Sequence, residues 1–176
     1  MRKQKGFSLI ELLIVVAIIL IIAAIAIPNL LRSRIAANEA SAVGSLRTIN
    51  TAEVTYSSTY PAYGFTDLVT LGPGTAGNTT AAAANACLLD NVLGCTAGTV
   101  GGAGCTKSGY TFLPTATGNG GTLPATPITT YSMNANPVTW QQSGVRTFYS
   151  DGSGVIRYNT SATASVPATA GDAPLQ

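Results

Sequence analysis

The chain has 176 residues, of which 46% are hydrophobic and only 9% are charged, and it contains no histidine. The formal net charge is +2, but without Arg2, Lys3 and Lys5 six basic and seven acidic side chains remain, a net charge of −1, so no nucleic-acid partner is predicted. Without histidine there is no Ser-His-Asp triad and metal ligation is poorly supported, so the sequence argues against an enzyme and predicts neither a metal nor a cofactor.

The first element in the chain is an apolar run close to the N-terminus. Residues 12–27 are all apolar, and the run extends back to Phe7 with only Ser8 and Glu11 as polar interruptions. A membrane-spanning helix needs about 20 residues, so this segment is long enough to cross a bilayer. The basic residues at positions 2, 3 and 5 predict that the N-terminus stays in the cytoplasm and that the rest of the chain is exported.

Glu11 is the acid within this run. A carboxylate near the centre of a membrane helix costs about 2.5 to 3.5 kcal/mol, so its presence needs an explanation. Glu11 lies about 6 Å along a helix from Phe7, a distance from which its side chain can reach the lipid headgroups. As a lone acid, Glu11 is therefore compatible with both a functional and a snorkelling interpretation.

Residues 5–13 (KGFSLIELL) resemble the processing site of type IV pilins and type II secretion pseudopilins. The resemblance implies that a membrane-embedded prepilin peptidase cuts between Gly6 and Phe7 and then N-methylates Phe7. It also implies assembly roles for Phe7, Glu11 and Pro28. The resemblance covers about residues 5–56 and does not extend with comparable specificity into the rest of the chain.

Cleavage at this position creates a cationic amine at the end of an apolar helix. That amine is costly in hydrocarbon unless it is paired, and the carboxylate of Glu11 is a suitable partner. The partner amine is either Phe7 of a neighbouring subunit or Phe7 of the same helix, one turn away. The sequence leaves these two arrangements open.

Two other interpretations of the N-terminal segment remain. In an ordinary secretory signal peptide, the residues Ala24, Ile25 and Ala26 would form the cleavage site. Glu11 inside the apolar core, and a core longer than about 7 to 15 residues, argue against it. The segment also fits a plain N-terminal membrane anchor.

After Pro28 the apolar residues recur at helical spacing, and the helix is predicted to continue to residue 57. Pro28 removes one hydrogen-bond donor and disfavours helical geometry at Ile27, so we expect a kink or a local melt there. Beyond the helix the composition changes to loops and short β-rich segments.

The predicted organisation has five parts: a leader (1–6), a transmembrane and assembly helix (7–28), its amphipathic continuation (29–57), a globular head (58–159) and a flexible tail (160–176). The predicted fold class is α+β, with the long helix packed against a small antiparallel β-sheet of three or four strands.

Within the head, a short helix is predicted at residues 86–93. The predicted strands are 110–113, 130–133, 145–149 and 155–158. The sequence from Asp151 to Gly154 predicts a hairpin turn rather than a calcium loop, because it contains a single carboxylate.

Three cysteines, Cys87, Cys95 and Cys105, permit three pairings and leave one thiol over. Export favours one disulfide. We favour Cys95 with Cys105, because they bracket a glycine-rich stretch, whereas Cys87 and Cys95 would be about 12 Å apart at the ends of the predicted helix.

The favoured function is a structural subunit of a type IV pilus or pilus-like filament. The resemblance implies a homo-oligomeric helical filament built by inner-membrane assembly machinery, with membrane lipid around the helix before assembly. The precursor is expected in the inner membrane with its head in the periplasm, and the mature form in an extracellular pilus or a periplasmic pseudopilus. A pseudopilin of a type II secretion system and a membrane-anchored exported binding module or adhesin are the alternatives.

Overall fold

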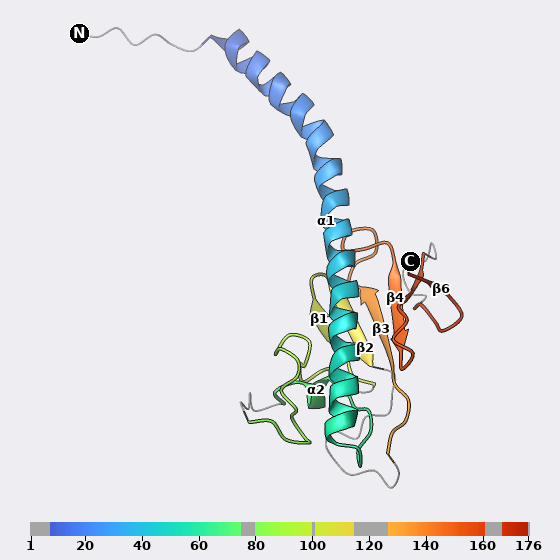
Figure 1. Ribbon diagram of the computed structural model, residues 1–176. Coiled ribbons are helices and arrows are strands. Elements are labelled where there is room, and N and C mark those ends of the chain that lie inside the picture. The colour runs from blue at the N-terminus through green and yellow to red at the C-terminus, as the bar shows by residue number, and fades with distance from the viewer. Residues whose placement is uncertain (1–7, 75–79, 100, 115–126, 161–166, 176) are drawn as a thin grey trace, which may run out of the picture. The chain divides into compact units, whose positions relative to one another are not determined.

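The computed structural model describes residues 8–74, 80–99, 101–114, 127–160 and 167–175. The chain divides into two compact units, an N-terminal unit, Met1–Arg34, and a head unit, Ile35–Gln176. The α+β fold class predicted from the sequence is confirmed, since a long helix precedes a small antiparallel sheet (Figure 1).

Helix α1 comprises Leu9–Thr59 and contributes residues to both units. In the N-terminal unit its large apolar side chains are exposed, from 43% at Leu31 to 80% at Leu9. In the head unit one side of α1 is buried, with Leu46, Ile49 and Tyr56 at 0% exposure. The 3- and 4-residue spacing of these side chains places them on one face, as the periodicity predicts.

Pro28 lies inside α1, and the residues on both sides of it are helical. The local melt expected at this position is therefore absent from the described helix. Proline removes a single hydrogen-bond donor, and the turns before and after it keep theirs, so one defect does not end a helix of this length.

The sheet has six antiparallel strands in sequential order. Strands β2 (Tyr110–Pro114), β3 (Ser132–Pro137), β4 (Thr147–Asp151) and β5 (Arg157–Asn159) overlap the four predicted strands. The sequence did not predict the two edge strands β1 (Cys105–Lys107) and β6 (Ala173–Pro174), which are very short.

A row of paired residues crosses the sheet at the centre of the core. Phe112 pairs with Ala135, Ala135 with Phe148, and Phe148 with Tyr158. The small Ala135 lies between the two phenylalanines, and these three residues belong to the same core cluster as the buried face of α1, with Tyr158 packed against it. The head unit therefore has two layers, a helix and a sheet, around one core (Figure 1).

The segment 86–93 is not helical, contrary to the sequence-based prediction. Cys87 has a φ of 54°, a left-handed backbone conformation that a right-handed helix excludes. A helix of four residues, α2 (Leu68–Leu71), forms earlier instead, where the side chain of Asp67 accepts a hydrogen bond from the N–H of Thr70.

Part of the predicted flexible tail is ordered against the head. The N–H of Leu175 donates to the carbonyl of Ile156 at 2.7 Å, and Ala168 is 2% exposed. The carboxylate of Asp172 accepts from the N–H of Thr169 at 2.6 Å, which closes a turn before β6. Residues 161–166 lie outside the described ranges.

Candidate functional site

The predicted processing site is at the N-terminal end of α1. Gly6 and Phe7 lie outside the described residues, so their roles stay predictions. Glu11 is in the first turn of α1 and is exposed. Pro28 is also exposed and lies within the same unit.

Ser8 and Glu11 form the hydrogen bond of a helix capping box. The N–H of Ser8 donates to Oε2 of Glu11 at 2.9 Å, and the N–H of Leu12 donates to the carbonyl of Ser8 at 3.3 Å. A serine followed three residues later by glutamate is the usual sequence signature of this cap. Ser8 is thus a contact of Glu11 that the sequence analysis missed, although the spacing was readable.

The capping contact defines what Glu11 is able to do. An ionised carboxylate has about four acceptor positions, and the hydrogen bond from Ser8 uses one of them. Glu11 therefore anchors the start of α1 and keeps the capacity to bind a cationic group nearby. The negative charge in the first turn also interacts favourably with the helix dipole.

The N-terminal unit presents an apolar surface with no core beneath it. An 18-residue window of α1 has a mean hydropathy of 3.3 and is not buried at all within the described structure. By length and composition this helix is able to cross a membrane, although an N-terminal signal sequence has the same properties. At 1.5 Å per residue, residues 9–31 extend over about 34 Å, slightly more than a hydrocarbon core of about 30 Å.

In the head unit, an ion pair between Glu39 and Arg146 joins α1 to the segment before β4. Oε2 of Glu39 lies 2.7 Å from Nη2 and 2.8 Å from Nε of Arg146, and Oε1 accepts from the N–H of Val145 at 2.9 Å. Glu39 is buried, so this carboxylate depends on these three donors. Asn38 adds a hydrogen bond to the carbonyl of Ser143 at 3.0 Å.

Arg146 also contacts aromatic rings. Its guanidinium carbon is 5.9 Å from the centroid of Phe148 and 5.8 Å from that of Tyr158. Tyr110 donates its hydroxyl proton to the carbonyl of Arg146 at 2.8 Å. Burial, and secondly the charge of Glu39, raise the pKa of Tyr110, so this hydroxyl remains a donor.

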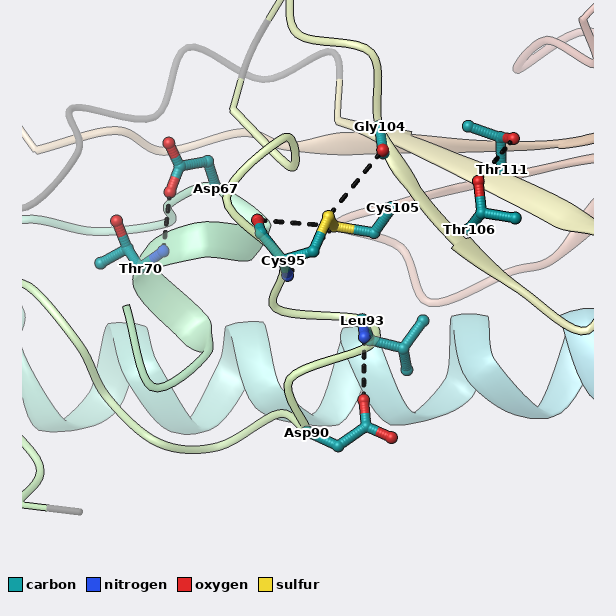
Figure 2. The surroundings of a disulfide bond; sticks show 9 residues. All are labelled: Asp67, Thr70, Asp90, Leu93, Cys95, Gly104, Cys105, Thr106 and Thr111. Atoms are coloured by element: carbon teal, nitrogen blue, oxygen red, sulfur yellow. Dashed lines mark hydrogen bonds between the residues drawn. A yellow bond between two sulfur atoms is a disulfide. The ribbon is translucent and has the colours of Figure 1, made fainter. Parts of the chain in front are cut away.

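The structure joins Cys95 to Cys105, the pair that the sequence analysis favours, with 5.6 Å between the Cα atoms (Figure 2). Around it, the N–H of Gly104 donates to the carbonyl of Ala97 at 2.9 Å, and the N–H of Leu68 donates to the carbonyl of Gly98 at 3.2 Å. The loop that this disulfide closes between Cys95 and Cys105, called here the disulfide loop, is therefore attached to α2. Cys87 is half-buried and lies outside this disulfide.

Asp90 closes the turn that leads into the disulfide loop. Its Oδ1 accepts from the N–H of Leu93 at 2.9 Å, as Figure 2 shows, and its Oδ2 pairs with Nζ of Lys107 at 3.0 Å. Burial raises the pKa of Asp90, but these two donors outweigh it, and the pKa lies below its ordinary value.

Metal-binding chemistry has little support in the described ranges. Within them, no group of three or more His, Cys, Asp or Glu side chains is placed to hold a metal ion. Asp151 instead accepts a hydrogen bond from the N–H of Ser153 at 2.9 Å, and the carbonyl of Asp151 accepts from Gly154 at 2.9 Å. This is the geometry of a turn.

Comparison with known proteins finds one family motif at the N-terminus and similarity to two pilins. Residues 1–27 match the family model of the prokaryotic N-terminal methylation motif. The chain is 67% identical over 39 residues to the type IV wide pilus major component PilA4 of Thermus thermophilus. It is also 45% identical over 56 residues to the type IV major pilin protein PilA of Myxococcus xanthus.

These similarities cover a limited part of each protein. The match to the Thermus protein covers 22% of this chain and 30% of the relative, and the match to the Myxococcus protein covers 32% and 26%. The chain thus matches less than a third of the length of either relative. No solved structure matches the chain significantly.

Proposed function

We propose that this chain is a type IV pilin, a structural subunit of a type IV pilus or pilus-like filament, and the methylation motif and the similarity to two type IV pilins support this proposal. The observation that carries the proposal is the methylation motif in a helix whose large apolar side chains are exposed over a membrane-spanning length. Such a surface needs lipid or other apolar helices around it.

The proposed pathway begins with the precursor held in the inner membrane by α1, with the N-terminus in the cytoplasm. Prepilin peptidase cuts between Gly6 and Phe7 and N-methylates Phe7. The assembly machinery then moves the subunit from lipid into a homo-oligomeric filament. In both environments the side chains of residues 9–31 are covered, first by lipid and then by copies of the same helix. No catalytic step by this chain is part of the proposal.

Glu11 has two tasks in this proposal. Its bond to the N–H of Ser8 holds the first turn of α1, and its remaining acceptor capacity binds the amine of Phe7 after cleavage. An amine paired with a carboxylate enters an apolar filament core at lower cost than an unpaired one. The pairing is either between neighbouring subunits or within one helix.

The processing step is tested by the intact mass and the N-terminal peptide of the protein isolated from its native cells. The expected mature chain begins at N-methylated Phe7. A chain that begins at Met1 or at Ile27 would contradict the proposal and favour an anchored or secreted protein. A Gly6→Val variant is expected to remain uncut, because a bulky side chain blocks peptidase recognition.

Glu11 is tested by two substitutions that separate charge from capping. Glu11→Gln keeps an acceptor for the N–H of Ser8 but removes the negative charge, whereas Glu11→Ala removes both. We expect both variants to insert into the membrane and to be cut, with filament yields reduced at least about tenfold, equivalent to about 1.4 kcal/mol. A normal yield from Glu11→Gln would contradict the pairing.

Electron microscopy of intact cells distinguishes the pilin from the pseudopilin. Long extracellular fibres that contain this protein are expected for a pilin. Fully processed protein without such fibres would instead favour the pseudopilin of a type II secretion system. An uncut, fibre-free protein would favour the exported binding module.

A further inference from the structure

A second buried acid of α1, Glu53, has no cationic partner among the described residues. Its exposed fraction is 0%, and its Oε2 accepts a hydrogen bond from the N–H of Thr66 at 3.1 Å. Oε1 is also buried, and within the described residues no hydrogen-bonding group reaches it. A buried charge that lacks a partner is costly, and a protein usually avoids it by keeping the group neutral.

The residues around Glu53 increase this cost. Asp67, which follows Thr66, is 2% exposed and accepts a hydrogen bond from the N–H of Thr70 as the cap of α2. The ion pairs of the described residues join Lys107 to Asp90 and Arg146 to Glu39, so neither provides a cation for Glu53. Glu53 and Asp67 are thus two buried acids on facing elements.

The other titratable groups near Glu53 are tyrosines. Tyr131 lies just before β3, and its hydroxyl donates to Oδ1 of Asn50 at 3.1 Å. Burial, and secondly the charge of Glu53, raise the pKa of Tyr131 to about 12. Tyr56, one turn after Glu53 on α1, donates its hydroxyl proton to the carbonyl of Ala83 at 2.7 Å. Both tyrosines remain neutral where Glu53 titrates, so they do not compensate its charge.

We propose that neutral Glu53 holds residues 66–71 against α1 and that ionisation of Glu53 releases this segment. Supporting this, the pKa of Glu53 is raised from 4.5 to about 8, chiefly by burial and to a smaller extent by the charge of Asp67, against the lowering effect of the hydrogen bond from Thr66. The device acts within the head and goes beyond the proposed role in a filament.

The contacts of residues 66–71 determine how far the release extends. The carbonyl of Thr70 accepts from the N–H of Ala86 at 2.7 Å, and the carbonyl of Leu71 accepts from Leu88 at 2.8 Å. The carbonyl of Gly98 accepts from the N–H of Leu68, which connects the disulfide loop. The released region therefore includes α2 and residues 86–98. The central strands β2 to β4 pair with one another and stay closed.

The sign of the pH dependence follows from proton binding. Between pH 4.5 and about 8 the folded head binds the proton of Glu53 and the open form does not. The free energy of opening therefore falls as pH rises through this window and becomes constant above about pH 8. For an acid stabilised by an ion pair, the free energy of opening would instead rise with pH.

Amide hydrogen exchange of the full-length protein in detergent micelles tests the proposal. Comparing wild type with Glu53→Gln at the same pH removes the intrinsic pH dependence of exchange. At about pH 9 we expect α2 and residues 86–98 to exchange at least about tenfold faster in wild type than in Glu53→Gln, and at about pH 5 we expect this ratio to fall towards one. Exchange in β2 to β4 is expected to stay equal.

The proposal would be overturned if the ratio of the wild-type exchange rate to the Glu53→Gln exchange rate in α2 and residues 86–98 were the same at both pH values. It would also be overturned if the difference in exchange rate extended equally over the whole sheet, or if Glu53→Gln exchanged faster than wild type at high pH. If Glu53→Gln does not fold, infrared spectroscopy of the wild type decides. A protonated-carboxyl carbonyl band that disappears between about pH 7 and about pH 9 supports a neutral Glu53, and the lack of such a band contradicts it. Neither measurement depends on filament formation.

Discussion

At the residue scale, the carboxylates of α1 differ in how the protein satisfies them. Glu11 is exposed and binds the N–H of Ser8, Glu39 is buried with Arg146, and Glu53 is buried with one backbone donor. All three belong to one helix, yet their surroundings give them different chemistry. The chemistry of an acid therefore depends on its burial together with the donors that its position provides.

Glu39 offers a prediction at this scale. Glu39→Gln should lower the free energy of unfolding by about 2 to 3 kcal/mol, because a single amide oxygen replaces a carboxylate that accepts from both Arg146 and Val145. Urea unfolding of the full chain in detergent provides the measurement. Arg47→Gln is the control on the exposed side of α1, with an expected change within about 0.5 kcal/mol. Equal effects of the two substitutions would contradict the structural role of the pair.

At the element scale, Gly44 is a weak point of α1. It lies inside the helix, lines an open groove of about 300 Å³, and a Cβ added there would meet no atom within 4 Å. Gly44→Ala should therefore raise the free energy of unfolding by about 1 kcal/mol through helix propensity alone.

The control for this substitution is a glycine that cannot accept a side chain. A Cβ on Gly94 would overlap the Cα of Gly72, the residue that follows α2. Gly94→Ala should therefore destabilise the head, opposite in sign to Gly44→Ala, in the same thermal unfolding experiment. A stabilising Gly94→Ala would show that the two backbones are not in contact.

The disulfide loop gives a second prediction at the element scale. Cys95 and Cys105 are separated by 10 positions, and replacing both with serine should cost about 3 kcal/mol by releasing the loop in the unfolded chain. Chemical denaturation with and without a reducing agent measures this difference. Reduction should lower the free energy of unfolding of the wild type to a value close to that of the double variant. It should leave the free energy of unfolding of the double variant unchanged. A double variant as stable as the oxidised wild type would contradict the stabilising role.

At the scale of the whole molecule, the two units differ in what they bury. Every buried residue of the described structure belongs to the head unit, whereas residues 9–31 expose their apolar side chains. The head therefore contains the hydrophobic core that a folded domain requires, whereas the described residues of the N-terminal unit form none.

A fragment that begins at residue 29 tests this division. We expect it to be soluble without detergent and to unfold cooperatively, within about 1 kcal/mol of the full chain in detergent, because it retains all buried residues of the described structure. Circular dichroism during heating checks the expectation. An unfolded or aggregated fragment would show that the N-terminal unit contributes to the stability of the head.

Local patterns in the sequence predicted several elements correctly. The long helix followed from the spacing of Leu46, Ile49 and Tyr56, and the four central strands followed from short β-rich runs between turn residues. Glu39 and Glu53 share this helical spacing and fall on the buried face, but the sequence analysis did not predict the burial of either acid. The helix at residues 86–93 was a wrong prediction, because a local pattern does not reveal the left-handed backbone at Cys87.

The sequence alone was sufficient to predict the N-terminal motif, the membrane-spanning length of the apolar run and the α+β class. Each of these depends on patterns among neighbouring residues. Three other features depended on tertiary structure: the burial of Glu53 beside Asp67, the pairing of Glu39 with Arg146, and the edge strand at Ala173–Pro174. Each of these contacts joins residues far apart in the chain, or side chains whose neighbours are set only when the helix packs on the sheet. Their energies come from desolvation and from partners that no local pattern specifies.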